Sequence, residues 1–138
     1  MITVNTYLIF DGNCEEAFNF YKTVLQKDVL QISHYKDVPQ SDKQLFNESD
    51  EKVMHATLQV SSETALMGCD MTNAPKQLTA YNFALYLRID STGQADRLFR
   101  ELSEGGRIGM PMTQTFWGSY YGILTDKFGV TWKIGVNL

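Results

Sequence analysis

The chain has 138 residues, a net charge of −4 and 43% hydrophobic residues, a composition typical of one globular domain. It has no cluster of lysine and arginine, so binding to nucleic acid or to an anionic membrane is not expected. No apolar run approaches the roughly 20 residues needed to span a bilayer, and we predict a cytoplasmic protein. Cys14 and Cys69 form no CxxC pair, so we predict two reduced thiols, with neither a disulfide nor a zinc site.

The first half of the chain predicts a strand, a helix and three further strands. Thr6–Phe10 is a short apolar strand that ends at an Asp-Gly turn. In the helix that follows, Asn13 is the expected N-cap and Glu16 its capping-box partner. The residues at helical spacing are Ala17, Phe20, Tyr21, Val24 and Leu25. Strands are predicted at 29–35, 53–60 and 64–69, with a long loop at 36–52 anchored by Leu45 and Phe46.

The second half repeats this order of elements. A linker at 70–80, which contains Pro75, precedes a strand at 82–89 and a helix capped by Asp90 or Ser91. The core side of that helix carries Ala95, Leu98, Phe99 and Leu102, and Gly105-Gly106 ends it. A strand at 107–113, interrupted by Pro111, then leads to a hairpin whose turn is 126–129. The order is βαβββ twice, at a spacing of roughly 75 residues.

Several short motifs occur along the chain: Phe10-Asp11-Gly12-Asn13-Cys14-Glu15-Glu16-Ala17, Phe20-Tyr21, Val53-Met54-His55-Ala56, Gly105-Gly106, Met110-Pro111, Thr115-Phe116-Trp117-Gly118 and Asp126-Lys127-Phe128-Gly129-Val130-Thr131-Trp132. Together they resemble the PhnB-like branch of the vicinal oxygen chelate superfamily, which includes glyoxalase I, bleomycin resistance proteins and extradiol dioxygenases. The resemblance implies an α+β glyoxalase/bleomycin resistance-like fold. Two βαβββ modules, about 1–72 and 80–138, would form one domain with an open cup and helices outside, commonly in a homodimer.

Some relatives of this branch are called demethylubiquinone methyltransferases. A glycine-rich nucleotide loop should follow a strand and open a helix, whereas Gly105-Gly106 follows a predicted helix. We therefore do not expect methyl transfer.

The resemblance also implies four metal-ligand positions, one on the first and one on the last strand of each module. They fall on Thr6, near Met67, on Phe83 or Ala84, and on Lys133. None of these side chains is a usual ligand, and an ammonium group would repel a cation. We therefore predict no metal and no other cofactor.

Strand alternation then predicts which side chains face the helices and which line the cup. The helix-facing sets are Tyr7/Ile9, Met54/Ala56/Leu58/Val60, Phe83/Leu85/Leu87 and Trp132/Ile134/Val136. The cup would be lined by Thr6, Leu8, Phe10, His55, Thr57, Gln59, Met67, Tyr86, Thr131 and Lys133, with Trp117 and Tyr121 as further candidates from the hairpin. Polar groups among apolar walls are typical of a small-molecule pocket.

Each candidate also has a structural interpretation. His55 is either a general base or a structural residue that bonds the long loop, and Lys133 either binds an anion or reaches solvent. Phe116, Trp117 and Tyr121 serve packing, in the core or a dimer, or ligand stacking. Cys14, at a helix N-terminus, is a conceivable nucleophile. Asp70 and Asp126 are most simply turn residues, and a metal site made from His34 and His55 depends on geometry that the sequence does not give.

Three functions remain open. The first is a metal-independent protein that binds a hydrophobic or cationic small molecule. The second is an enzyme acting on a small organic or phosphonate-type substrate, with His55 as acid or base and Lys133 or an atypical metal as electrophile. The third is a ligand-free scaffold whose aromatic hairpin serves only a dimer interface.

Overall fold

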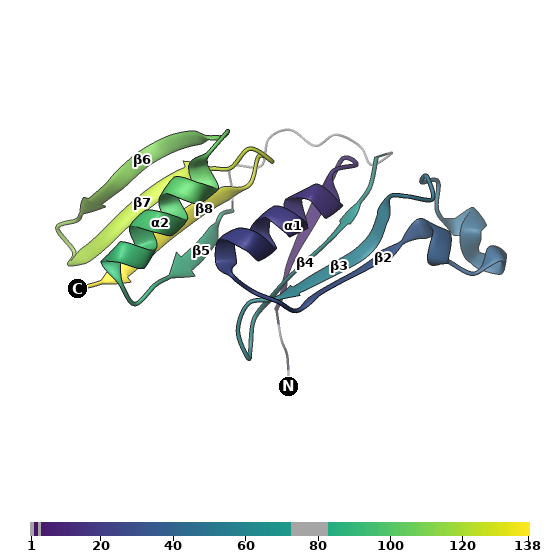
Figure 1. Ribbon diagram of the computed structural model, residues 1–138, viewed down its shortest axis with the longest axis horizontal. Helices are drawn as coiled ribbons and strands as arrows, with labels where there is room; N and C mark the ends of the chain where they lie inside the picture. The colour runs from purple at the N-terminus through teal and green to yellow at the C-terminus, as the bar shows by residue number, and fades with distance from the viewer. Residues whose placement is uncertain (1, 3, 73–82) are drawn as a thin grey trace. The chain divides into compact units, whose positions relative to one another are not determined.

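A computed structural model describes residues 2, 4–72 and 83–138, and the chain divides into two compact units, Met1–Lys76 and Gln77–Leu138. Each unit is a four-stranded mixed sheet with one α-helix packed on it (Figure 1). Most of the predicted linker, the first residue of the strand predicted at 82–89, and the side chain of Leu45 lie outside the described part. The expectation that both modules form one domain stays a prediction.

The first unit contains β1 (Thr6–Phe10), α1 (Cys14–Leu25), β2 (Leu30–His34), β3 (Val53–Gln59) and β4 (Ala65–Asp70). The sheet order is β1-β4-β3-β2, with β1 parallel to β4 and the other neighbours antiparallel. These elements confirm the predicted strands and helix, with ends that differ by one or two residues.

Helix α1 begins differently from the predicted capping box. The Asn13 side chain makes no capping hydrogen bond; instead Oδ1 of Asp70 accepts hydrogen bonds from the backbone N–H groups of Gly12 and Cys14, both at 3.0 Å. An acceptor from the end of β4 therefore satisfies the helix N-terminus, which a local side chain usually does. The buried face of the helix contains Phe18 in place of the predicted Phe20.

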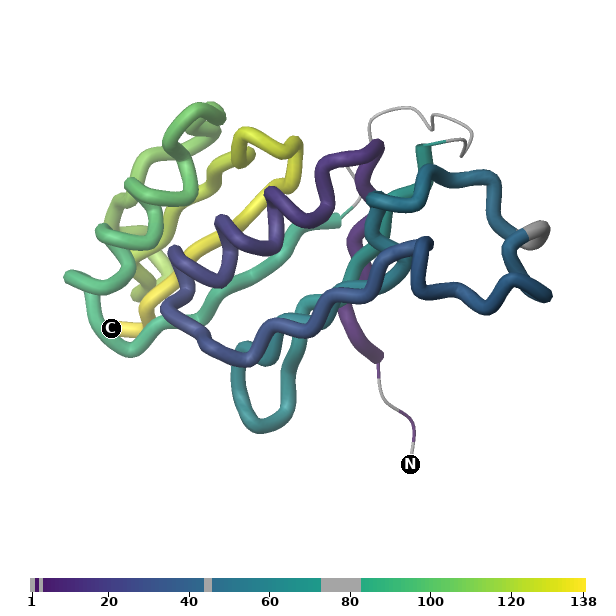
Figure 2. The backbone as a smooth tube through the Cα atoms, turned by 45° about the vertical axis from the view of Figure 1, so that its right-hand side comes forward, coloured from purple at the N-terminus to yellow at the C-terminus, as the bar shows by residue number. Residues whose placement is uncertain are grey.

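The segment between β2 and β3 is ordered by local structure and by distant contacts. It forms two short 3₁₀-helices, Tyr35–Asp37 and Gln40–Leu45, and projects beyond the end of the first sheet (Figure 2). The Tyr35 hydroxyl donates to the Asp70 carbonyl oxygen at 2.9 Å, and the Glu48 carboxylate accepts from the backbone N–H and the hydroxyl of Thr72. These bonds tie the segment to the end of β4 and to the residues that follow it.

The second unit has the same topology. It contains β5 (Leu85–Arg88), α2 (Thr92–Ser103), β6 (Arg107–Gln114), β7 (Ser119–Thr125) and β8 (Thr131–Asn137), in sheet order β5-β8-β7-β6. The Ser91 hydroxyl accepts from the Gln94 N–H and caps α2, as predicted. Irregular register between β6 and β7 surrounds Pro111, because proline has no N–H for the ladder.

The predicted hairpin is β7 and β8. In its turn, Asp126 Oδ1 accepts from the N–H groups of Phe128 and Val130, and Gly129 has the positive φ of 87° that favours glycine. Asp126 is thus a turn residue, as predicted, and its Oδ2 also accepts from the indole N–H of Trp132.

The repeated βαβββ order and the α+β fold class are confirmed. Within the described residues, no helix is long and apolar enough to cross a membrane.

Candidate functional site

Each sheet has a helix side and an open side, and the alternation of its strands assigns residues to them. In the first unit a methyl group added to Gly68 would touch the Phe18 ring of α1, so Gly68 and its β1 partner Leu8 face the helix. The opposite side is called here the first open face. It carries Tyr7, Ile9, His55, Thr57, Met67 and Cys69.

The prediction for β1 was wrong by one residue. Leu8 is only 5% exposed and Phe10 packs edge-to-face on Phe18, whereas Tyr7 and Ile9 are 46% and 61% exposed. The whole strand is apolar except for Thr6, so its sequence shows no alternation that distinguishes the two faces. Thr6, Leu8 and Phe10 therefore belong to the helix side, and Tyr7 is the open-face residue that the prediction missed.

His55 lies on the first open face, as predicted, within a short chain of polar contacts. Its Nε2 is 2.8 Å from the Thr57 hydroxyl, and its Nδ1 is 3.4 Å from the Tyr7 hydroxyl. A neutral imidazole offers one donor and one acceptor, so Tyr7 donating to Nδ1 leaves Nε2–H to donate to Thr57. The bond to Tyr7 is long, and Nδ1 is therefore the atom that an incoming ligand reaches most easily.

Tyr7 also contacts Cys69 beside it on β4. Loss of water around the phenol, and next the hydrogen bond with Cys69, raise the pKa of Tyr7 from 10.0 to about 12. Burial likewise raises the pKa of the Cys69 thiol. Both groups are therefore neutral at pH 7.

The remaining residues predicted for this side have separate environments. Met67 lies on the first open face beside Tyr7 and Thr57. The Gln59 amide donates to the backbone oxygens of Ser61 and Thr64, so it holds the β3–β4 turn.

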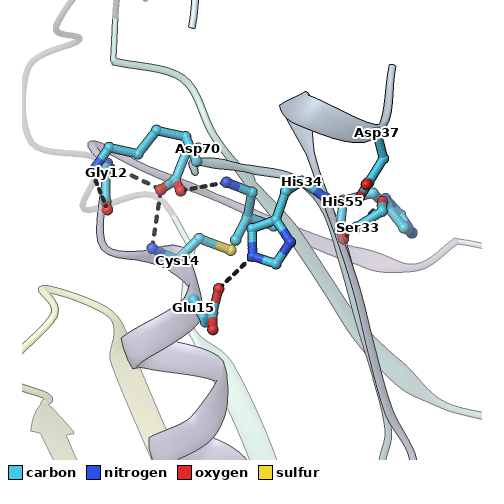
Figure 3. Close-up of polar contacts among 10 residues, drawn as sticks. Gly12, Cys14, Glu15, Ser33, His34, Asp37, His55 and Asp70 are labelled. Carbon is cyan, nitrogen blue, oxygen red and sulfur yellow. Dashed lines mark hydrogen bonds and ion pairs between the residues drawn. The ribbon is translucent and has the colours of Figure 1, made fainter. Parts of the chain in front are cut away.

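His34 and His55 do not form a pair. Nε2 of His34 is 2.6 Å from a carboxylate oxygen of Glu15 in α1, so His34 faces the helix while His55 lies on the open side (Figure 3). Cys14 is completely buried, and burial first, then the Asp70 carboxylate, raise the pKa of its thiol. A nucleophilic role for Cys14 is therefore contradicted.

Asp70 is more than a turn residue. It ends β4 and is 1% exposed. Its carboxylate accepts three hydrogen bonds, from the backbone N–H groups of Gly12, Cys14 and Val53, the last at 2.9 Å (Figure 3). It joins β1, α1 and β3 at one point, and this role is structural.

The second unit has its own open face. A methyl group at Gly122 would touch the Phe99 ring of α2, so the helix side holds Gly122 and its β8 partner Ile134. The opposite side is called here the second open face, and it carries Tyr86, Arg88, Tyr121, Ile123, Thr131, Lys133 and Gly135. Tyr86, Thr131 and Lys133 confirm the predicted alternation. Phe83 does not, because it precedes β5 and is exposed.

The aromatic residues of the hairpin extend this face. Trp117 is 57% exposed and packs edge-to-face on Tyr121, with ring centroids 5.8 Å apart, and Phe116 is 97% exposed. Core packing is therefore excluded for Phe116 and Trp117, whereas ligand stacking and dimer packing stay predictions.

The positions that the family resemblance assigns to a metal do not fit a divalent ion in this chain. Thr6 lies on the helix side, Met67 and Lys133 offer only a thioether and an ammonium group, and no group of three or more His, Cys, Asp or Glu side chains in the described part forms a metal site. The chemistry that these faces offer is hydrogen bonding, stacking and, at His55, proton transfer.

Comparisons with known proteins agree with the fold. Protein YjdN of Escherichia coli K12 is 29% identical over 96% of this chain and 94% of its own length. The crystal structure of PA1353 from Pseudomonas aeruginosa has a TM-score of 0.86 at 36% identity, covering 99% of this chain and 98% of that one. The PhnB protein from Bacillus cereus has a TM-score of 0.79 at 26% identity, covering 98% and 99%.

A more distant likeness concerns the fold alone. The fosfomycin resistance protein FosX from Listeria monocytogenes, crystallised with Mn(II) and sulfate, has a TM-score of 0.64 at 11% identity, covering 100% of this chain and 95% of that one. The family model described as 3-demethylubiquinone-9 3-methyltransferase matches residues 2–135. The chain thus belongs to that PhnB-like family, and its fold is that of glyoxalase/bleomycin resistance proteins.

Proposed function

We propose that this protein binds a small organic molecule on the open faces of its sheets, without the divalent metal of the superfamily's enzymes. The observation that carries the proposal is that each sheet is covered by its helix on one side only. The other side presents aromatic side chains next to hydrogen-bonding groups, Tyr7 with His55 in one unit and Tyr86 with Lys133 in the other. Such a mixture is typical of small-molecule sites.

The test is an amide NMR titration with a neutral aromatic probe, 1-naphthylacetamide. We expect saturable shifts of amides in β1, β3, β5 and β8 next to the open faces, and none on the solvent side of α1 or α2. Shifts confined to the helices, or no shifts at all, would contradict the proposal. Adding Mn²⁺ tests metal independence, because bound Mn²⁺ would broaden the signals around its site.

An enzyme is the second candidate, and the contacts of His55 favour it. A base needs a ring nitrogen that reaches the substrate, and among the described residues Nδ1 of His55 has only the long contact to Tyr7. If the protein is an enzyme, His55→Ala should abolish turnover. If it only binds its ligand, the same variant should weaken binding or leave it unchanged. The matched variant His55→Gln keeps hydrogen bonding and removes proton transfer, so only the enzyme alternative predicts that it is inactive.

Methyl transfer, which the family's description names, is not part of this proposal. The described junctions between strand and helix, 11–13 and 89–91, contain a single glycine, Gly12, and Gly105-Gly106 follows α2. Adding S-adenosylmethionine should leave the amide spectrum unchanged, and saturable shifts would contradict this exclusion.

A homodimer and a cytoplasmic location also stay predictions. Native mass spectrometry of the protein purified without chelator reports its assembly, any metal and any retained ligand together. A stoichiometric divalent ion would overturn the metal-free proposal.

A further inference from the structure

The strands of the two sheets differ in charge. Strands β5 to β8 contain Arg88, Arg107 and Lys133 and no aspartate or glutamate, although the chain as a whole has a net charge of −4. Strands β1 to β4 contain no lysine or arginine, and their one carboxylate is that of buried Asp70. Positive charge therefore belongs to the second sheet only.

The strand register brings two of these cations together on the second open face. Lys133 is the β8 partner of Tyr86, and Arg88, two residues further along β5, is the partner of Gly135. Arg88 and Lys133 are thus diagonal neighbours on one side of the sheet, a distance that long side chains bridge.

Gly135 creates the space between the two cations, and a phenol occupies it. A methyl group at Gly135 would collide with the Tyr86 hydroxyl, so the Tyr86 ring lies over the glycine. Tyr121 pairs with Gly135 from the other side, and Trp117 packs on Tyr121. The surface therefore consists of aromatic rings, with the charged groups of Arg88 and Lys133 on either side of the Tyr86 hydroxyl.

No carboxylate neutralises these charges within the part of the chain that the structure describes. Ion pairs such as His34–Glu15, Lys43–Asp50 and Arg97–Glu101 form there, and within the described residues none includes Arg88 or Lys133. The groups that surround a ligand here, an ammonium, a guanidinium and phenol hydroxyls, all donate hydrogen bonds. Such a set complements an anion.

We propose that the second open face binds an organic anion, a carboxylate or phosphonate on an aromatic body. Lys133 and Arg88 hold the anionic group, and Tyr86, Tyr121 and Trp117 contact the body. The inference rests on the proposed function and specifies the ligand class for one of its two faces. It replaces the expectation of a hydrophobic or cationic ligand for this unit, because a cationic ligand would be repelled.

The experiment compares 1-naphthylacetate with its uncharged amide, 1-naphthylacetamide, by amide NMR titration of the full chain. We expect the acid to bind about fivefold more tightly than the amide, the effect of one exposed charge pair, with shifts centred on β5 and β8. Lys133→Met and Arg88→Gln should each lower the affinity for the acid more than the affinity for the amide, and so reduce this preference. Higher ionic strength should weaken binding of the acid alone.

The control is Arg100→Gln, which removes the same charge from the exposed side of α2 in the same unit and should change neither affinity. The spectrum of each variant reports its folding directly. Equal binding of acid and amide, or binding of both on the first open face only, would overturn the anion site and leave the proposed function standing. Binding of neither probe would count against both, and so would a second copy of the chain that covers this face and excludes the probes.

Discussion

Replacing Asp70 with asparagine tests the most connected polar group of the first unit. The side chain keeps its shape and loses its charge. One carboxylate oxygen accepts from Gly12 and Cys14 and the other from Val53, and the group is almost completely buried. An amide has a single acceptor oxygen, so in either orientation its NH₂ group faces at least one backbone N–H.

The magnitude follows from the best orientation. If the amide oxygen keeps the hydrogen bonds from the Gly12 and Cys14 N–H groups, the hydrogen bond from the Val53 N–H is lost. Loss of a hydrogen bond to a charged group costs about 1.5–3 kcal/mol. The Val53 N–H is also left buried without an acceptor, at about 1–3 kcal/mol. We therefore expect Asp70→Asn to lower the free energy of unfolding by about 2.5–6 kcal/mol, a large share of the stability of an ordinary domain.

Urea unfolding followed by far-ultraviolet circular dichroism measures this loss. The control is Asp28→Asn, which makes the same charge change at an exposed position and should stay within about 0.5 kcal/mol of the wild type. Faster hydrogen exchange at the Cys14 and Val53 amides would locate the effect. A loss below about 1 kcal/mol would refute the view that Asp70 joins β1, α1 and β3.

Three further predictions concern the first unit. Tyr7 should keep its proton up to about pH 12, and its raised pKa means that the folded state holds a proton which the unfolded state loses, so stability should fall as pH rises from 10.0 to about 12. The ultraviolet titration of the wild type minus that of Tyr7→Phe isolates this phenol, and ionisation near pH 10 in the difference would contradict the prediction. Cys14 and Cys69 are buried with raised pKa values, so neither should react with a thiol reagent before unfolding, and rapid labelling of the native protein would disprove it. Gly68→Ala should destabilise by about 1–3 kcal/mol in thermal or urea unfolding, because the new methyl group would lie 2.8 Å from the Phe18 ring; unchanged stability would show that this ring moves freely.

Where polar and apolar residues alternate, the sequence predicted the side-chain directions correctly. In β3 and β8, Ala56, Leu58, Trp132 and Ile134 face the helices while His55 and Lys133 face outward. Burying the apolar set leaves a single arrangement for each strand, because a shift by one residue exposes it completely. The repeated βαβββ order could be predicted from the sequence for the same reason.

The side-chain directions in β1 and the role of Asp70 could not be predicted in this way. Each strand needs partners distant in the sequence, and β1 consists of apolar and aromatic residues at four of its five positions, so either face is acceptable locally. Its pairing with β4 decides that Tyr7 lies outward beside His55.

The sequence by itself determined the order of elements and the outward position of His55, Tyr86 and Lys133, because local spacing and alternation carry that information. The fold class followed from the resemblance to a known family. Only the tertiary structure decided that Tyr7 joins His55 and that Asp70 caps a helix 56 residues earlier in the chain. The physical reason is that a buried donor is satisfied by whichever acceptor the fold brings near it, and sequence distance does not limit that choice.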